Sequence, residues 1–153
     1  MANQLELEGI VAKDSRSVYE PGKRTGKWQK FKLYLEEEFL IGGFIPSGQG
    51  GVESVVLGKR NGDHLHYVAC LDVRMPLPES RAAAKKLDAI KAARCPFAIP
   101  KRKPGNSWSG GMTEQQQNTD VWVEPKHTAD VNFLERTRGG FLRHAQVKTL
   151  TIE

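Results

Sequence analysis

Alternation of apolar and polar side chains runs through most of the chain and predicts β-strands. In residues 5–13, two leucines and a valine fall on one face and two glutamates on the other, which is the two-residue period of a strand. The pair Gly42-Gly43 predicts a bulge or bend, and Asn61-Gly62-Asp63 predicts a hairpin turn. Further strands are expected at residues 27–35, 38–45, 52–59, 65–73, 120–123, 131–134 and 141–147.

A helical period is found in residues 79–94, where Ala83, Leu87 and Ile90 line one face and Cys95-Pro96 is expected to end the helix. Residues 101–118 have no period and are rich in Lys, Arg, Gly, Ser and Gln. A segment of that length predicts a functional or disordered loop.

The elements together predict a mainly β fold. Five or so strands with one inserted α-helix and glycine-marked bends fit a Greek-key β-barrel of the OB-fold type. A split β-sandwich would give a similar pattern, so the residues leave that alternative open.

Composition excludes several classes of protein. The 153 residues contain two cysteines, too few for a disulfide framework, and they form no CxxC zinc motif. The beginning of the sequence has neither a basic nor an apolar leader region, and no apolar run could span a bilayer. We therefore expect a soluble cytoplasmic protein, and its net charge of +5 favours an anionic partner.

Two features near the amino end carry candidate chemistry. Glu8 presents a carboxylate opposite the apolar face and precedes Gly9, so it is either a metal- or sugar-binding group or an ordinary solvated glutamate. Lys30 and Lys32 share one strand face, with Trp28 and Tyr34 on the same side. Two ammonium groups about 7 Å apart suit the oxygens of a phosphate chain, although a solvated Lys-rich strand has the same spacing.

Two basic regions have the composition of a nucleic-acid surface. Cations bind phosphates and aromatic rings bind sugar or base faces, but a merely soluble basic surface looks the same in composition. The candidate DNA-binding residues are Lys101, Arg102, Lys103, Arg136, Arg138 and Arg143.

Taken in order, the segments resemble the covalent nucleotidyltransferases. Residues 7–13 resemble motif IV and residues 26–32 resemble motif V of that superfamily. Residues 17–24 are similar to the Y-x-P-G-x-R segment of bacterial ATP-dependent DNA ligases. The remaining similar segments are residues 39–44, 122–125 and 133–144. The resemblance covers nearly the whole chain and is strongest to the C-terminal region of bacterial ligases of the end-joining repair type.

The resemblance implies a division of the chain at residue 35. Residues 1–35 would be the last strands of an adenylation (nucleotidyltransferase) domain, and residues 36–153 an OB-fold domain. Glu8 would hold the metal, and Lys30 and Lys32 would contact the nucleotide phosphates. The full-length enzyme would use ATP and Mg2+ to join nicks or ends in duplex DNA.

The resemblance also implies the partners, the oligomeric state and the cellular location of the protein. Its partners would be duplex DNA and the N-terminal part of the adenylation domain, and the protein would be monomeric and associated with the nucleoid. This chain by itself is expected to bind neither ATP nor Mg2+ tightly. A hinge between nucleotidyltransferase strand and barrel is expected at residues 32–38.

Two departures from the family pattern leave alternatives open. The sequence holds no K-x-D-G lysine motif, and Thr151 stands where motif VI has an arginine. We therefore expect that this chain cannot form a lysyl-adenylate. The alternatives are a stand-alone, non-enzymatic DNA-binding protein derived from a ligase and a fragment of an RNA-capping or RNA-ligase relative.

Overall fold

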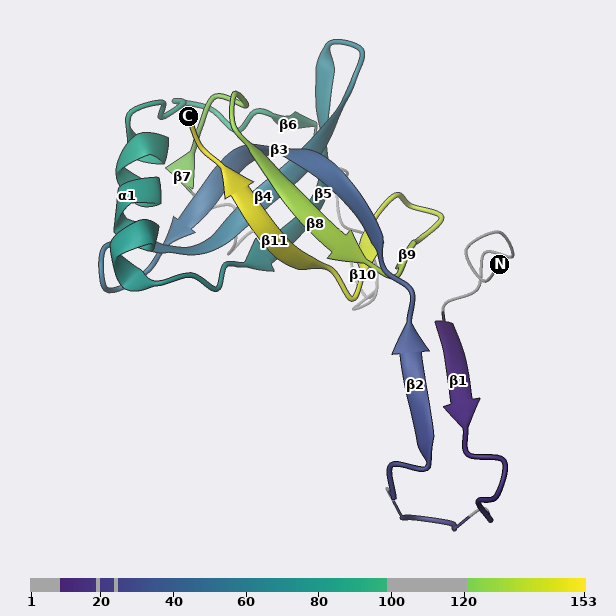
Figure 1. Ribbon diagram of the computed structural model, residues 1–153. Helices are drawn as coiled ribbons and strands as arrows, with labels where there is room; N and C mark the ends of the chain where they lie inside the picture. The colour runs from purple at the N-terminus through teal and green to yellow at the C-terminus, as the bar shows by residue number, and fades with distance from the viewer. Residues whose placement is uncertain (1–8, 19, 24, 99–120) are drawn as a thin grey trace.

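The computed structural model describes residues 9–18, 20–23, 25–98 and 121–153 (Figure 1). These residues form one helix, α1 (Leu77–Asp88), and a set of mainly antiparallel strands. The strands are β1 (Gly9–Lys13), β2 (Trp28–Lys32), β3 (Leu35–Pro46), β4 (Val52–Asn61), β5 (His64–Asp72), β6 (Phe97–Ala98), β7 (Val121–Trp122), β8 (Thr128–Phe133), β9 (Glu135–Arg136), β10 (Leu142–Arg143) and β11 (Gln146–Thr151).

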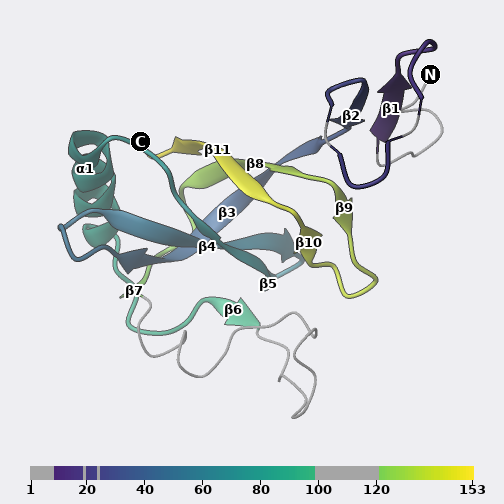
Figure 2. The same cartoon turned by 90° about the horizontal axis from the view of Figure 1, so that it is seen from below.

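The main sheet curls around one core. Its order is β11-β8-β3-β4-β5-β6, with β7 also paired to β3, and Figure 2 shows the strands crossing as they wrap around the centre. The strands β5 and β11 contact each other, but no strand pairing joins them among the described residues. The strand order is non-sequential, the sheet coils, and α1 follows β5 in the chain. These features confirm the expected mainly β fold class.

The long strand β3 bends at the glycine pair predicted from the sequence. Its register against β4 shifts between Ile41 and Gly43. The half before the shift pairs with β8, and the half after it pairs with β7. This bulge lets one strand serve two neighbours and turns the sheet around the core.

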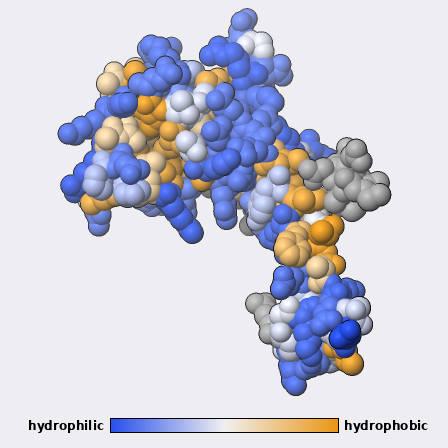
Figure 3. All heavy atoms as spheres, in the orientation of Figure 1, coloured by the Kyte–Doolittle hydropathy of each residue, from blue (hydrophilic) through white to orange (hydrophobic). Residues whose placement is uncertain are grey.

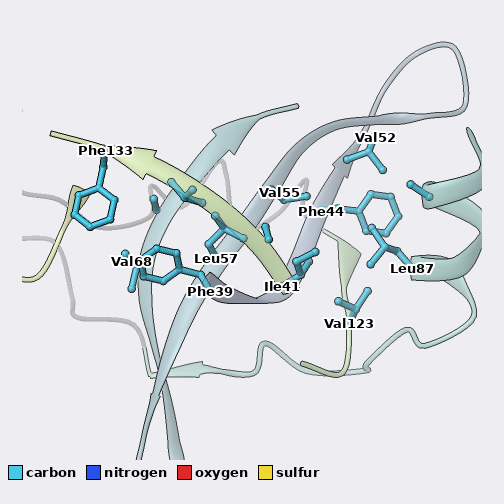
Figure 4. Packing of buried hydrophobic residues seen from close by; sticks show 14 residues of the cluster. Phe39, Ile41, Phe44, Val52, Val55, Leu57, Val68, Leu87, Val123 and Phe133 are labelled. Carbon is cyan, nitrogen blue, oxygen red and sulfur yellow. The ribbon is translucent and has the colours of Figure 1, made fainter. Parts of the chain in front are cut away.

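Buried aliphatic and aromatic side chains fill the interior (Figure 4). Phe39, Ile41 and Leu57 from the sheet are at most 1% exposed. Helix α1 covers one end of the sheet and inserts Leu87, which is 0% exposed. Burying a leucine of this kind contributes about 2 kcal/mol, so the helix is held by its apolar face.

A second small cluster surrounds Phe97 on β6. A Cβ added to Gly42 would lie 2.4 Å from Cζ of the Phe97 ring, and one added to Gly58 would lie 2.5 Å from Cε1. The ring edges of Tyr67 and Trp122 also meet Phe97, with centroids 6.1 and 6.0 Å away. The two glycines therefore make room for the ring on the surface of β3 and β4.

The strands β1 and β2 form a separate hairpin that extends from the barrel (Figure 1). Leu33 and Tyr34 link it to β3. Figure 3 shows apolar atoms at the surface where the hairpin meets the barrel. Several large hydrophobic side chains of this part are exposed, among them Ile10, Val11, Phe31, Tyr34 and Leu35.

Some expected boundaries were wrong. The helix ends at Asp88 rather than residue 94, because the following residues pair with β7 and its extension. The Ala92 N–H donates to the Trp122 carbonyl at 2.8 Å, and the Glu124 N–H donates to the Ile90 carbonyl at 2.9 Å. The strand expected at 27–35 ends at Lys32 and the one expected at 141–147 is divided between β10 and β11. The loop expected at 101–118 lies outside the described residues.

No described helix has the length and apolar character needed to cross a membrane.

Candidate functional site

The β1–β2 hairpin places the two candidate lysines on one exposed face. Lys30 pairs with Val11 and Lys32 pairs with Gly9. Because directly opposed residues in an antiparallel ladder share a face, these four residues line the same side of the hairpin. Both lysines are exposed, and the described residues contain no acidic partner within ion-pair distance of either one. The face can therefore accept an anion.

Trp28 and Lys13 extend this face toward the hairpin turn. They are directly opposed in the ladder, and Lys13 Nζ lies 4.1 Å from the centroid of the Trp28 ring. The Trp28 indole Nε1–H donates to Ser17 Oγ at 3.2 Å, which fixes the ring in the direction of the loop. Lys13 is thus a third cation on the face. The strand pattern by itself does not indicate Lys13 as a candidate, whereas the hairpin pairing of residues 13 and 28 does.

Gly9 allows the two hairpin strands to lie close together. A Cβ at this position would lie 2.3 Å from the carbonyl oxygen of Phe31, a distance that real Cβ atoms do not reach. The space beside Gly9 is therefore occupied by the backbone of β2. Glu8 itself lies outside the described residues, and its role as a metal ligand stays a prediction. Within the described part, no group of three His, Cys, Asp or Glu side chains could hold a metal ion.

The opposite face of the hairpin is apolar. Ile10 and Phe31 are directly opposed, and they are 48% and 50% exposed. A two-stranded hairpin is only marginally stable without a packing partner, and neighbouring exposed apolar side chains mark an interaction surface. This face indicates that another part of a protein packs on the hairpin.

The arginines of β9 and β10 do not form one surface. Arg136 pairs in the ladder with Leu142, whereas Arg143 pairs with Glu135, so the two arginines lie on opposite faces of this short hairpin. Arg138 is exposed in the turn between the strands. The candidates Lys101, Arg102 and Lys103 lie outside the described residues. The DNA-binding roles of all six stay predictions.

Glu37 connects three elements of the barrel. Its carboxylate accepts hydrogen bonds from Lys59 on β4 and from Arg136 on β9. The Arg136 guanidinium also lies over the rings of Phe39 and Phe133, at 5.4 and 5.5 Å from their centroids. Partial desolvation would raise the pKa of Glu37, but the hydrogen bonds and charges of Lys59 and Arg136 outweigh it and hold that pKa below its usual value.

We expect Glu37→Gln to lower the free energy of unfolding by on the order of 1 kcal/mol at neutral pH, as for a well-connected exposed ion pair. A folded-state pKa below the unfolded value of 4.5 stabilises the fold above that pH, and the stabilisation is lost as pH falls through the folded pKa. The difference between wild type and variant in urea unfolding should therefore disappear in acid. Glu53→Gln, a change at an exposed position of β4, is the control. A pH-independent difference would contradict the assignment.

A family model and a curated protein each match most of this chain. The family model described as ATP dependent DNA ligase C terminal region matches residues 48–151. The multifunctional non-homologous end joining protein LigD of Mycolicibacterium smegmatis is 30% identical over 141 residues, which is 90% of this chain and 17% of that protein.

Two solved structures are similar over almost all of the chain. The ligase domain of M. tuberculosis LigD has a TM-score of 0.65 and 25% identity, over 97% of this chain and 46% of that one. A mycobacterial DNA ligase D complexed with ATP and MES has a TM-score of 0.63 and 24% identity, over 99% of this chain and 46% of that one. The chain thus spans less than half of these domains and about a sixth of the LigD relative.

Proposed function

The chain belongs to the family of ATP-dependent DNA ligase C-terminal regions, and we propose that it works as that part of an enzyme which joins nicks or ends in DNA through an enzyme-adenylate. In this proposal residues 1–35 complete an adenylation domain and residues 36–153 form the DNA-binding OB-fold domain. The mycobacterial relatives act in end joining according to their names, which supports a cytoplasmic DNA-repair role.

The two-sided character of the β1–β2 hairpin carries this proposal. One face bears Lys13, Lys30 and Lys32, and the other bears Ile10 and Phe31 with their apolar surface exposed. A hairpin of this kind fits an element that packs its apolar side on a preceding domain and turns its cations toward a polyphosphate. The N-terminal part of the adenylation domain is the partner that we assign to the apolar face.

ATP is the substrate that the cationic face would hold. Adenylyl transfer places negative charge on the α-phosphate and on the leaving pyrophosphate, and fixed ammonium groups stabilise that charge in the transition state. Lys30 and Lys32 are suited to this task because no acidic group neutralises them within the described residues. A Mg2+ ion would supply further charge stabilisation, and Glu8 is the residue that we propose to hold it.

Replacement of the motif VI arginine by Thr151 favours a second candidate, a DNA-binding protein without ligase activity. Thr151 ends β11 and is exposed, and its uncharged hydroxyl cannot replace the cation that the resemblance implies at this position. Both candidates bind DNA, so binding does not separate them. The two candidates differ in adenylylation. If a protein that contains the lysine nucleophile needs Lys30 and Lys32 to form the adenylate, the ligase candidate is supported over the non-enzymatic one.

We expect the 153-residue chain to form no covalent adenylate when it is incubated with radiolabelled ATP and Mg2+. Its sequence contains no K-x-D-G lysine, and all the lysines that the structure describes are exposed on the surface. Gel electrophoresis after denaturation provides the measurement, with an intact ligase as positive control. A labelled band from this chain that resists denaturation would contradict the missing-nucleophile argument.

A further inference from the structure

A hollow of about 760 Å3 lies on the barrel, and its lining includes no described residue of the β1–β2 hairpin. Three segments line it: the end of β4, the start of β5 with β6 beside it, and the β9–β10 turn. Its volume is in the range of small-ligand sites. The lining residues are Lys59, Arg60, Asn61, His66, Tyr67, Val68, Ala98, Arg136, Gly139, Gly140 and Phe141.

Aromatic rings form one side of the hollow. The rings of Tyr67 and Phe141 are 6.2 Å apart at an angle of 53°, and Tyr67 also packs edge-on against Phe97. Phe141 is held by its turn, because its N–H donates to Thr137 Oγ1 at 3.1 Å and its carbonyl accepts from the Thr137 N–H at 2.8 Å. These bonds hold the backbone of Phe141 in place, and its ring packs against Tyr67.

Cations form the other side. The lining includes Lys59, Arg60 and Arg136 and no acidic residue. Glu37 binds Lys59 and Arg136 from outside the lining, so it neutralises one of their two charges and fixes both side chains in place. The hollow keeps a net positive charge beside ordered rings.

Rings next to fixed cations are the combination that binds unstacked nucleotides. An aromatic side chain stacks on a base only where the base face is accessible, whereas the bases of a continuous duplex cover one another. Phosphate contacts alone would suit duplex backbone and would need neither the rings nor a concave surface. The observed lining fits a base on Phe141 and Tyr67, with its phosphate near Lys59 and Arg136.

We propose that this hollow binds one unpaired nucleotide of a DNA end, as a subsite beside the duplex-binding surface. The inference rests on the proposed function, since it requires that the barrel binds DNA. It adds a preference between DNA substrates: an end with a short single-stranded overhang binds better than a blunt end.

The test compares binding of the 153-residue chain to two fluorescent duplexes of equal duplex length, one blunt and one with a two-nucleotide overhang. We expect about tenfold tighter binding of the overhang, because base–aromatic stacking contributes on that scale. Phe141→Ala should remove the preference and leave blunt-duplex affinity unchanged. Phe141→Trp keeps a stacking ring and should retain the preference, and Lys126→Ala, a surface change outside the hollow, should leave it unaltered.

The outcomes separate this inference from the proposed function. Equal binding of blunt and overhang duplexes by wild type overturns the subsite while DNA binding stands. Equal weakening of both duplexes by Phe141→Ala also overturns it, provided that thermal melting shows a folded variant. If Phe141→Ala does not fold, loss of the preference in Phe141→Trp overturns it instead. Failure to bind either duplex overturns the DNA-binding proposal together with the subsite.

Discussion

Lys30→Ala combined with Lys32→Ala is expected to lower the rate of enzyme-adenylate formation at least about 100-fold in a complete ligase, since removal of a transition-state charge contact costs this much or more. A complete ligase here means this chain joined to the part of the M. tuberculosis LigD ligase domain that it does not match. Both lysines lie on one exposed face of β2, so the change removes charge without removing buried contacts. Single-turnover adenylylation with labelled ATP measures the effect.

The control for this pair is Lys126→Ala, which removes a lysine that pairs with Glu124 on the barrel surface. It should leave adenylylation unchanged. Thermal unfolding of the double variant should also match wild type, because neither lysine packs in the core. Full adenylylation by the double variant would show that the cationic hairpin face does not handle the nucleotide.

Gly58→Ala is expected to cause the largest loss of stability among the glycine substitutions in the sheet. The added Cβ would lie 2.5 Å from the Phe97 ring and 2.7 Å from the carbonyl oxygen of His66. The second contact is to backbone, so β4 and β5 must move apart at a point where their register already shifts. Overpacking of this kind costs about 1–3 kcal/mol, measured as a lower midpoint in urea or a lower Tm.

Gly48→Ala is the matched control, since a Cβ there meets nothing within 4 Å and the residue does not have a positive φ. It should be neutral or slightly stabilising, because alanine reduces the conformational freedom of the unfolded chain. Equal stability of the two variants would mean that β4 and Phe97 do not pack as described.

Local patterns predicted the elements better than their pairing. The glycine bend of β3 and the hairpin turn at Gly62 follow from residues close together in sequence. The end of α1 could not be predicted in the same way. It depends on two hydrogen bonds to the distant β7 region, one donated by the Ala92 N–H to Trp122 and one accepted by the Ile90 carbonyl from Glu124. These bonds override a helical period that continues to residue 94.

The candidate site shows the same limit. Alternation along β2 placed Lys30 and Lys32 on one face, which the ladder confirms. Lys13 was missed because its place depends on the register of β1 against β2. Outside this site, the packing of Phe97 was also missed, because two glycines on different strands make room for its ring. The arginines of β9 and β10 were grouped by composition, but hairpin register puts Arg136 and Arg143 on opposite faces.

Sealing of a nicked duplex by the joined protein tests the central claim most directly. The protein consists of this chain preceded by the unmatched part of the M. tuberculosis LigD ligase domain. With ATP and Mg2+ present, we predict a sealed product that forms only when both parts are in one polypeptide and that is lost in Lys30→Ala, Lys32→Ala. A joined protein that unfolds cooperatively, binds the nick and still leaves it unsealed, with no adenylate formed, would contradict the claim.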